Sequence, residues 1–137
     1  MAEISVKELE NSERVLNLLA HIDGISYEQQ SERRDLFSIY ESDTDLTAVL
    51  DVEEDVVVIF IPIMEQEPSG DLAIALLQMN DTILYGAFTL HDGKLFFKVN
   101  LAIENLDLNE LEDGIRSVFI ATYAALPIIS IHNKKEI

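Results

Sequence analysis

The sequence predicts a single α+β domain in which helices pack on an antiparallel sheet. Helical periodicity occurs near both ends of the chain, a short apolar helix is expected over 71–79, and the segments between read as strands. The pair Asp92-Gly93, between two alternating segments, is a strong signal for a hairpin. Helices and strands are too segregated along the chain for a parallel α/β sheet. The expected order is therefore α-β-β-β-α-β-β-α.

The composition indicates one folded domain with an acidic surface. The chain has 137 residues, and 48% of them are apolar, which is too many for a disordered chain. We expect one domain over 1–137, with residues 126–137 as a partly ordered tail. The 26 acidic and 9 basic residues give a formal net charge of −17. Because such a surface repels phosphate backbones and anionic lipid, nucleic acid and membranes are not expected as partners.

Two further features of the composition bear on location and partners. There is no cysteine, which excludes disulfides and thiolate chemistry and fits a reducing cytoplasm. The N-terminus is polar and has no apolar segment of a targeting signal, so a cytoplasmic location is expected. The negative charge serves either solubility alone or the recognition of a basic or apolar partner.

The N-terminal half is expected to form one helix followed by strands. Ser5 and Glu8 have the spacing of a capping box, and Gly24 is a natural stop, so a helix is expected over about 5–21. Residues 25–30 are a possible short strand. Further strands are expected over 36–41, 46–52 and 56–63.

The segment over 56–63 is apolar at every position. A strand with one face on water should alternate, so both faces of the sheet are expected to be covered near this segment. Helices can cover one face, and a second subunit or a bound target can cover the other. Pro62 has no amide donor, so it is expected near the strand end or at an edge.

The helix expected over 71–79 has almost no polar face. A helix that is apolar all round is buried on all sides, which suggests a subunit interface. The alternative is a helix sunk in the core of a monomer. The candidate dimer or partner contacts taken from this helix and the apolar strand are Ile59, Ile61, Ile74 and Leu77.

The C-terminal half is expected to form a hairpin and a long helix. Alternating residues on either side of the turn His91–Lys94 predict the two hairpin strands. Asp107 and Glu110 have the spacing of a second capping box. The helix that follows is expected to end at about Leu126, because Pro127 prevents normal continuation. The remainder is expected to be a short extended segment and a frayed tail.

The sequence contains no recognisable catalytic or metal-binding motif. The three histidines lie far apart, and there is no G-x-S-x-G motif or glycine-rich phosphate loop. Acidic clusters at Asp43-x-Asp45 and over 51–55 lack the spacing of a calcium loop and fall where turns are expected. We therefore predict no catalytic, metal-binding or cofactor-binding residue and no cofactor. The alternative from another class is a hydrolase that uses dispersed carboxylates.

Three segments of the C-terminal half resemble a known group of proteins. They are DLAIALLQMN over 71–80, YGAFTLHDGKLFFKVNL over 85–101 and IENLDLNELEDGI over 103–115. The first is a helix ending in Leu-x-x-Asn, the second a hairpin with an Asp-Gly turn, and the third a pause before a long helix. In this order they resemble the type III secretion chaperone-like fold, which includes class I secretion chaperones and the YbjN family of bacterial putative regulators.

The resemblance implies a non-enzymatic homodimer that binds proteins. Secretion chaperones dimerise through a central helix and the sheet, and they wrap an extended client segment around exposed apolar surface. Addition of the client as a strand would use ordinary sheet-edge hydrogen bonding. We therefore expect an uncharacterised bacterial protein-binding module, chaperone-like or regulatory, of the YbjN-like or secretion chaperone-like group. A dedicated type III secretion effector chaperone is the alternative within this class.

Overall fold

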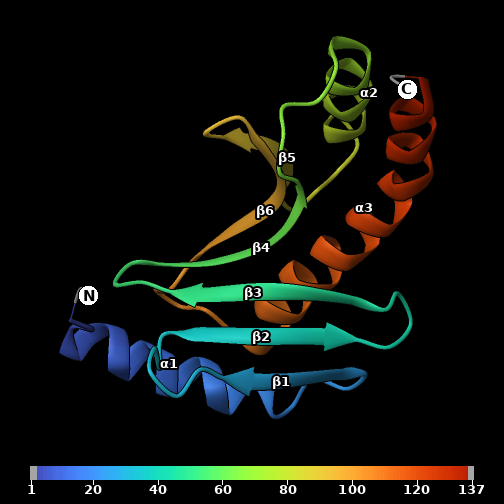
Figure 1. Ribbon diagram of the computed structural model, residues 1–137. Helices are drawn as coiled ribbons and strands as arrows, with labels where there is room; N and C mark the ends of the chain where they lie inside the picture. Colours follow the sequence, from blue (N-terminus) through green and yellow to red (C-terminus); the bar gives the residue numbers. More distant parts are fainter. Residues whose placement is uncertain (1–2, 136–137) are drawn as a thin grey trace.

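The computed structural model describes residues 3–135, and it describes side chains over 3–132. Over these residues the chain forms three helices and a six-stranded antiparallel sheet of order β1-β2-β3-β4-β6-β5 (Figure 1). The elements are α1 (Val6–Leu19), β1 (Ile25–Gln29), β2 (Leu36–Glu41), β3 (Leu46–Val52), β4 (Val56–Met64), α2 (Gly70–Asn80), β5 (Ala87–His91), β6 (Lys94–Ala102) and α3 (Leu108–Lys135).

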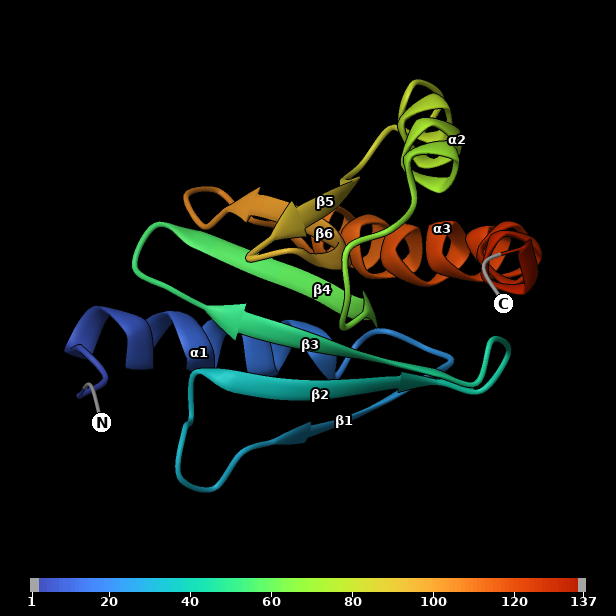
Figure 2. The same ribbon diagram turned by 45° about the horizontal axis from the view of Figure 1, so that its top comes forward.

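The two terminal helices cover only one face of the sheet. Figures 1 and 2 show α1 and α3 on the same side of the strands, and α2 beyond the end of the sheet near β5. In β4, Val57, Ile59 and Ile61 point to the covered side and are buried. Their neighbours Val58 and Phe60 are only partly buried. The structure therefore has a helix-covered face and an open face.

The predicted α+β class and antiparallel sheet are confirmed, and the order has one strand more than α-β-β-β-α-β-β-α. The added strand is β1, in the segment that the sequence indicates only as a possible short strand. It pairs with β2 in the register Ile25↔Glu41. Most of its side chains are exposed, so it carries little hydrophobic pattern. This segment is a strand because it pairs with β2 at the sheet edge. The pattern of residues within the segment does not predict that pairing.

The predicted helix starts agree with the observed caps. The Ser5 hydroxyl accepts from the Glu8 amide at 3.0 Å, and the Glu8 carboxylate accepts from the Ser5 amide at 3.1 Å. At α3 the Asp107 carboxylate accepts from the Glu110 amide at 2.8 Å. Pro62 lies near the end of β4, where the pairing with β6 is irregular. This position is the one expected for a residue without an amide donor.

The prediction that Pro127 ends the last helix is wrong. The helix α3 continues through Pro127 to Lys135, so the expected extended segment is absent from the described residues. A proline inside a helix costs about 3 kcal/mol. Beyond it, Ile128 packs against the core and Ile129 is buried. Because burying one such side chain contributes about 1.5–3 kcal/mol, packing offsets the cost of Pro127.

The helix α3 is the main helix of the core. By length and composition alone, its segment from Leu108 to His132 could cross a membrane. Its apolar character has another cause in this structure, because one stripe of the helix is packed on β4 and β6. That stripe is fully buried and comprises Leu111, Ile115, Val118 and Phe119.

Candidate functional site

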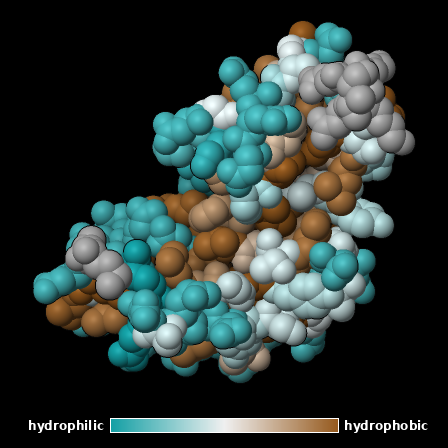
Figure 3. All heavy atoms as spheres, viewed as in Figure 1, coloured by the Kyte–Doolittle hydropathy of each residue, from teal (hydrophilic) through white to brown (hydrophobic). Residues whose placement is uncertain are grey.

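The open face of the sheet carries an apolar band across its middle. The register aligns Phe60 with Lys98 and Pro62 with Phe96 on the side away from α1 and α3. The Phe60 and Phe96 rings meet edge to face with centroids 5.9 Å apart. Figure 3 shows hydrophobic residues gathered in the middle of this face, between hydrophilic upper and lower parts. A shallow hollow of about 240 Å³ lies on this face and is lined by Val58, Phe60, Thr89, His91, Phe96 and Lys98.

One border of the band is acidic. Asp51 of β3 is aligned with Val58 of β4 on the open face. Burial raises the pKa of the Asp51 carboxyl, and repulsion from Glu53 and Asp35 raises it further. A nearby cation stabilises the ionised form of such a carboxyl. This border therefore favours basic groups on a bound segment.

A neighbouring ion pair fixes the loop between β1 and β2. The Arg33 guanidinium donates to both Asp35 carboxylate oxygens at 3.0 and 2.8 Å. These hydrogen bonds lower the pKa of the buried Asp35 carboxyl. Asp35 also accepts at its backbone carbonyl from the Val52 amide at 2.8 Å, which ties this loop to the end of β3. The pair is therefore a structural anchor next to the open face.

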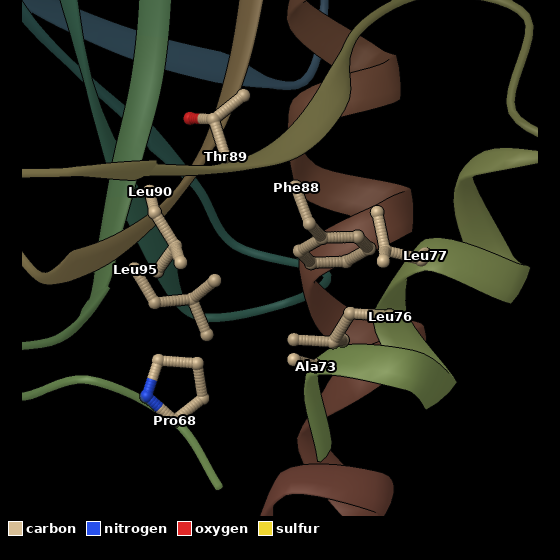
Figure 4. Close-up of a pocket in the computed structure, with 8 residues that line it drawn as sticks. All are labelled: Pro68, Ala73, Leu76, Leu77, Phe88, Thr89, Leu90 and Leu95. Atoms are coloured by element: carbon tan, nitrogen blue, oxygen red, sulfur yellow. The ribbon is translucent and has the colours of Figure 1, made fainter. Parts of the chain in front are cut away.

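A second apolar surface lies on α2 and the neighbouring hairpin. Leu72 and Leu76 of α2 are buried, whereas Ile74 is 57% exposed and Leu77 is 65% exposed. Beside them is a pocket of about 210 Å³ between α2 and the β5–β6 hairpin (Figure 4). Its lining is almost wholly apolar and comprises Pro68, Ala73, Leu76, Leu77, Phe88, Thr89, Leu90 and Leu95.

The four candidate contact residues divide between the core and the surface. Ile59 and Ile61 are buried on the covered face of β4, below α3, so they offer no surface to a partner in this structure. Ile74 and Leu77 are exposed on α2. The helix is therefore not sunk in the core of the monomer, which was the alternative for its apolar sequence.

Sequence reasoning missed the residues of the open face. In β4 the apolar residues that alternate with Ile59 and Ile61 are Val58 and Phe60, and these are the ones that remain accessible. The signal was present, because an apolar strand without alternation must place one of its two residue sets on each face. Which of the two sets is buried depends on the face that α3 covers. The sequence of the strand alone does not show that face.

The two edges of the sheet differ. At β5, the Phe88 amide donates to Asn80 Oδ1 at 2.8 Å, and Asn80 Nδ2 donates to the Phe88 carbonyl at 3.2 Å. The side chain of Asn80 thus occupies the outer backbone groups of Phe88 in this strand. At the opposite edge, β1 has no strand on its outer side in the described sheet. An added strand would therefore find its unpaired backbone groups at β1.

The described residues bring no ionisable cluster together that resembles a metal centre. No group of three or more His, Asp or Glu side chains within this part of the chain has the geometry to hold a metal ion. His91 is exposed in the hairpin turn, with its Nε2 atom 3.4 Å from the Asp92 carboxylate. The features that this structure does present are accessible apolar surface, a free strand edge and acidic borders, which suit protein binding.

The fold and these surfaces define the class of secretion chaperone-like proteins, and comparison with known proteins agrees. The model of the type III secretion chaperone family CesT_Tir_1 matches residues 8–129. The chain belongs to this family. No curated protein sequence is significantly similar to it.

A solved structure shares the fold. It is that of SpcU in the heterodimeric ExoU–SpcU complex from the type III secretion system of Pseudomonas aeruginosa. The similarity has a TM-score of 0.55 at 15% sequence identity, and it covers 91% of this chain and 98% of the other. The secretion chaperone-like fold predicted from the sequence is therefore confirmed.

Proposed function

We propose that the protein is a non-enzymatic chaperone of the bacterial cytoplasm that holds an extended segment of a client protein and acts as a homodimer. The main support is the open face, where Phe60 and Phe96 remain accessible at the centre of a sheet. A contiguous patch of partly exposed apolar side chains on one face of a sheet is a candidate interaction site.

We propose that the client lies on the open face and at the β1 edge. A segment in extended conformation would pair its backbone with β1 and direct apolar side chains toward the sheet. The acidic chain, with a net charge of −17, favours a client segment that carries basic residues. Asp51, at the border of the apolar band, would be one such contact.

We propose that the second subunit binds at α2. Ile74 and Leu77 are exposed there beside an apolar pocket, and Leu90 on the hairpin is 52% exposed. An isologous contact would cover the same residues on both subunits. This arrangement leaves the β1 edge of each subunit free for a client.

We propose a secreted effector as the client. The family that matches the chain is that of type III secretion chaperones, which favours this branch over a YbjN-like regulator. SpcU, which has the same fold, is found in complex with ExoU.

Co-purification tests the client site. The protein is co-expressed with N-terminal segments of secreted proteins encoded beside its gene, and the complex is isolated by a tag on the segment. We expect one segment to retain the wild-type chain, and Phe60→Ser and Phe96→Ser to reduce the retained amount. Ile131→Ser, which changes an exposed apolar residue of α3, is the matched control. Equal retention of all variants would contradict the proposed client site.

Light scattering on a sizing column tests the dimer separately. We expect a mass of twice 15.5 kDa for the wild-type chain. Leu77→Asp and Ile74→Asp should give monomers, because a charge at the centre of an apolar interface is left without a partner. Ile131→Asp should remain dimeric. A monomeric wild type at high concentration would overturn the homodimer without affecting the client site.

A further inference from the structure

A groove runs along the outer side of α3, away from the open face and from the pocket on α2. It is about 620 Å³ in volume and lies between α3 and the connection from α2 to β5. One wall is a stripe of α3 from Asp113 to Ala124, which is about 16 Å long at 1.5 Å per residue. The other wall is formed by Met79, Thr82, Ile83, Leu84 and Tyr85.

The walls of this groove are apolar and accessible. Leu84 is 87% exposed and Ile120 is 64% exposed, one on each wall. Ala121 and Ala124 lie next to Ile120 on α3, and their small side chains give the groove its depth. A ridge of larger side chains from another helix would fit such a groove.

The exposed position of Leu84 is fixed by the structure around it. Ser117 Oγ donates to the Tyr85 carbonyl at 2.6 Å, which ties the connection to α3. Next to it, Gly86 has a φ of +86° and no room for a Cβ, because one would lie 2.6 Å from Val99 Cγ2. The groove is therefore a preformed feature with low ordering cost for a ligand.

The charge around the groove is negative. Asp113 lines it and Asp81 precedes Thr82 in its wall, and both are exposed. Among residues 3–132, no cationic group lies within 4 Å of either carboxylate.

Arg116, the one basic residue among the described residues that line the groove, is already engaged. Its guanidinium contacts Glu112 at 2.9 Å and Glu41 at 3.6 Å, and it donates to the Asp23 carbonyl at 2.8 Å. Its positive charge is therefore balanced within the chain. The groove as a whole presents a negative field to any segment that enters it.

We propose that this groove binds a basic amphipathic helix of a protein partner, separately from the client on the open face. Leu84 and Ile120 would contact its apolar side, and Asp113 and Asp81 would contact Lys or Arg at its border. A second copy of the chain fits this groove less well, because it has only 9 basic residues against 26 acidic ones to meet the carboxylates of Asp113 and Asp81.

Titration with defined peptides tests the proposal. The probe is a short amphipathic helical peptide of Leu and Lys, and the matched peptide has Glu in place of Lys. We expect one-to-one binding of the Lys peptide, with amide NMR shifts confined to residues 79–85 and 113–124. Leu84→Ser and Ile120→Ser should each weaken binding about tenfold, which corresponds to about 1.4 kcal/mol.

Charge variants distinguish binding of the Lys peptide in the groove from its general attraction to an acidic protein. Asp113→Lys should weaken binding of the Lys peptide, and Asp43→Lys, the same change in an exposed turn, should have a much smaller effect. Equal effects of these two variants, or NMR shifts spread over the surface, would overturn the proposal. A dimer that dissociates in Ile120→Ser would also overturn it, because a second copy would then occupy the groove.

Discussion

The side chain of Asn80, the last residue of α2, pairs with both backbone groups of Phe88 at the edge of β5, at 2.8 and 3.2 Å. This residue therefore links the end of α2 to β5 and occupies two of the edge groups that another chain could use. Asn80 ends the Leu-x-x-Asn segment by which the sequence resembles secretion chaperones, and this pairing gives the motif a physical role.

Replacing Asn80 tests that role. Asn80→Ala leaves the amide and carbonyl of Phe88 without partners, so we expect the free energy of unfolding to fall by about 1–3 kcal/mol. Urea denaturation measures the change. Asn17→Ala, at an exposed position of α1, should stay within about 0.5 kcal/mol of wild type. Equal stability of Asn80→Ala and wild type would show that water replaces the side chain at no cost.

Gly86 is expected to tolerate no side chain. Its φ is +86°, and a Cβ would lie 2.6 Å from Val99 Cγ2 and 2.7 Å from the Lys98 carbonyl oxygen. Gly86→Ala should destabilise the fold by about 1–3 kcal/mol. Gly70→Ala is the control, because a Cβ there meets no atom within 4 Å. A thermal unfolding midpoint for Gly86→Ala as high as that of Gly70→Ala would contradict this account.

Asp51 should make the fold less stable as the pH rises. Burial raises the pKa of its carboxyl above the ordinary value of about 3.8, so the folded state binds a proton more tightly than the unfolded state. Stability from this group is full below the unfolded pKa and is lost as the pH rises through the folded pKa. Asp51→Asn should therefore be more stable than wild type at pH 7 and lose that advantage in acid. A variant less stable than wild type at pH 7 would contradict the assignment.

Asp35 should show the opposite dependence. Its pKa is lowered by the hydrogen bonds from Arg33, so it contributes stability above the unfolded pKa of about 3.8 that is lost as the pH falls through the folded pKa. Asp35→Asn should destabilise the fold at pH 7 by about 1–3 kcal/mol. The difference from wild type should shrink in acid, as measured by urea denaturation over a range of pH. A difference independent of pH would point to packing and not to charge.

Pro127 is a candidate for stabilisation. It lies inside α3, where it removes an amide donor from a helix that nonetheless continues. Pro127→Ala restores the donor at an exposed position and should raise the free energy of unfolding by up to about 3 kcal/mol. Calorimetry measures the shift of the midpoint. A lower midpoint would mean that Pro127 is needed for the packing of Ile129.

The sequence was informative wherever the cause of a structure is local. The capping box at Ser5 and Glu8, the Asp107 cap, the Asp-Gly turn and the fold class follow from neighbouring residues, and the structure has all of them. Features that depend on distant packing were harder to predict. The continuation of α3 beyond Pro127 depends on burial of Ile129, and the accessibility of Phe60 in place of Ile59 depends on where α3 lies.

The central claim is that the sheet holds an extended client segment at the β1 edge and on its open face. Hydrogen–deuterium exchange of the chain, alone and with a bound client segment, tests it most directly. We predict slower exchange of the outward-pointing amides of β1, Ile25–Gln29, in the complex, because these amides become hydrogen-bonded to the added strand. Unchanged exchange at β1, with slowing confined to α2 or α3, would contradict the claim and place the client elsewhere.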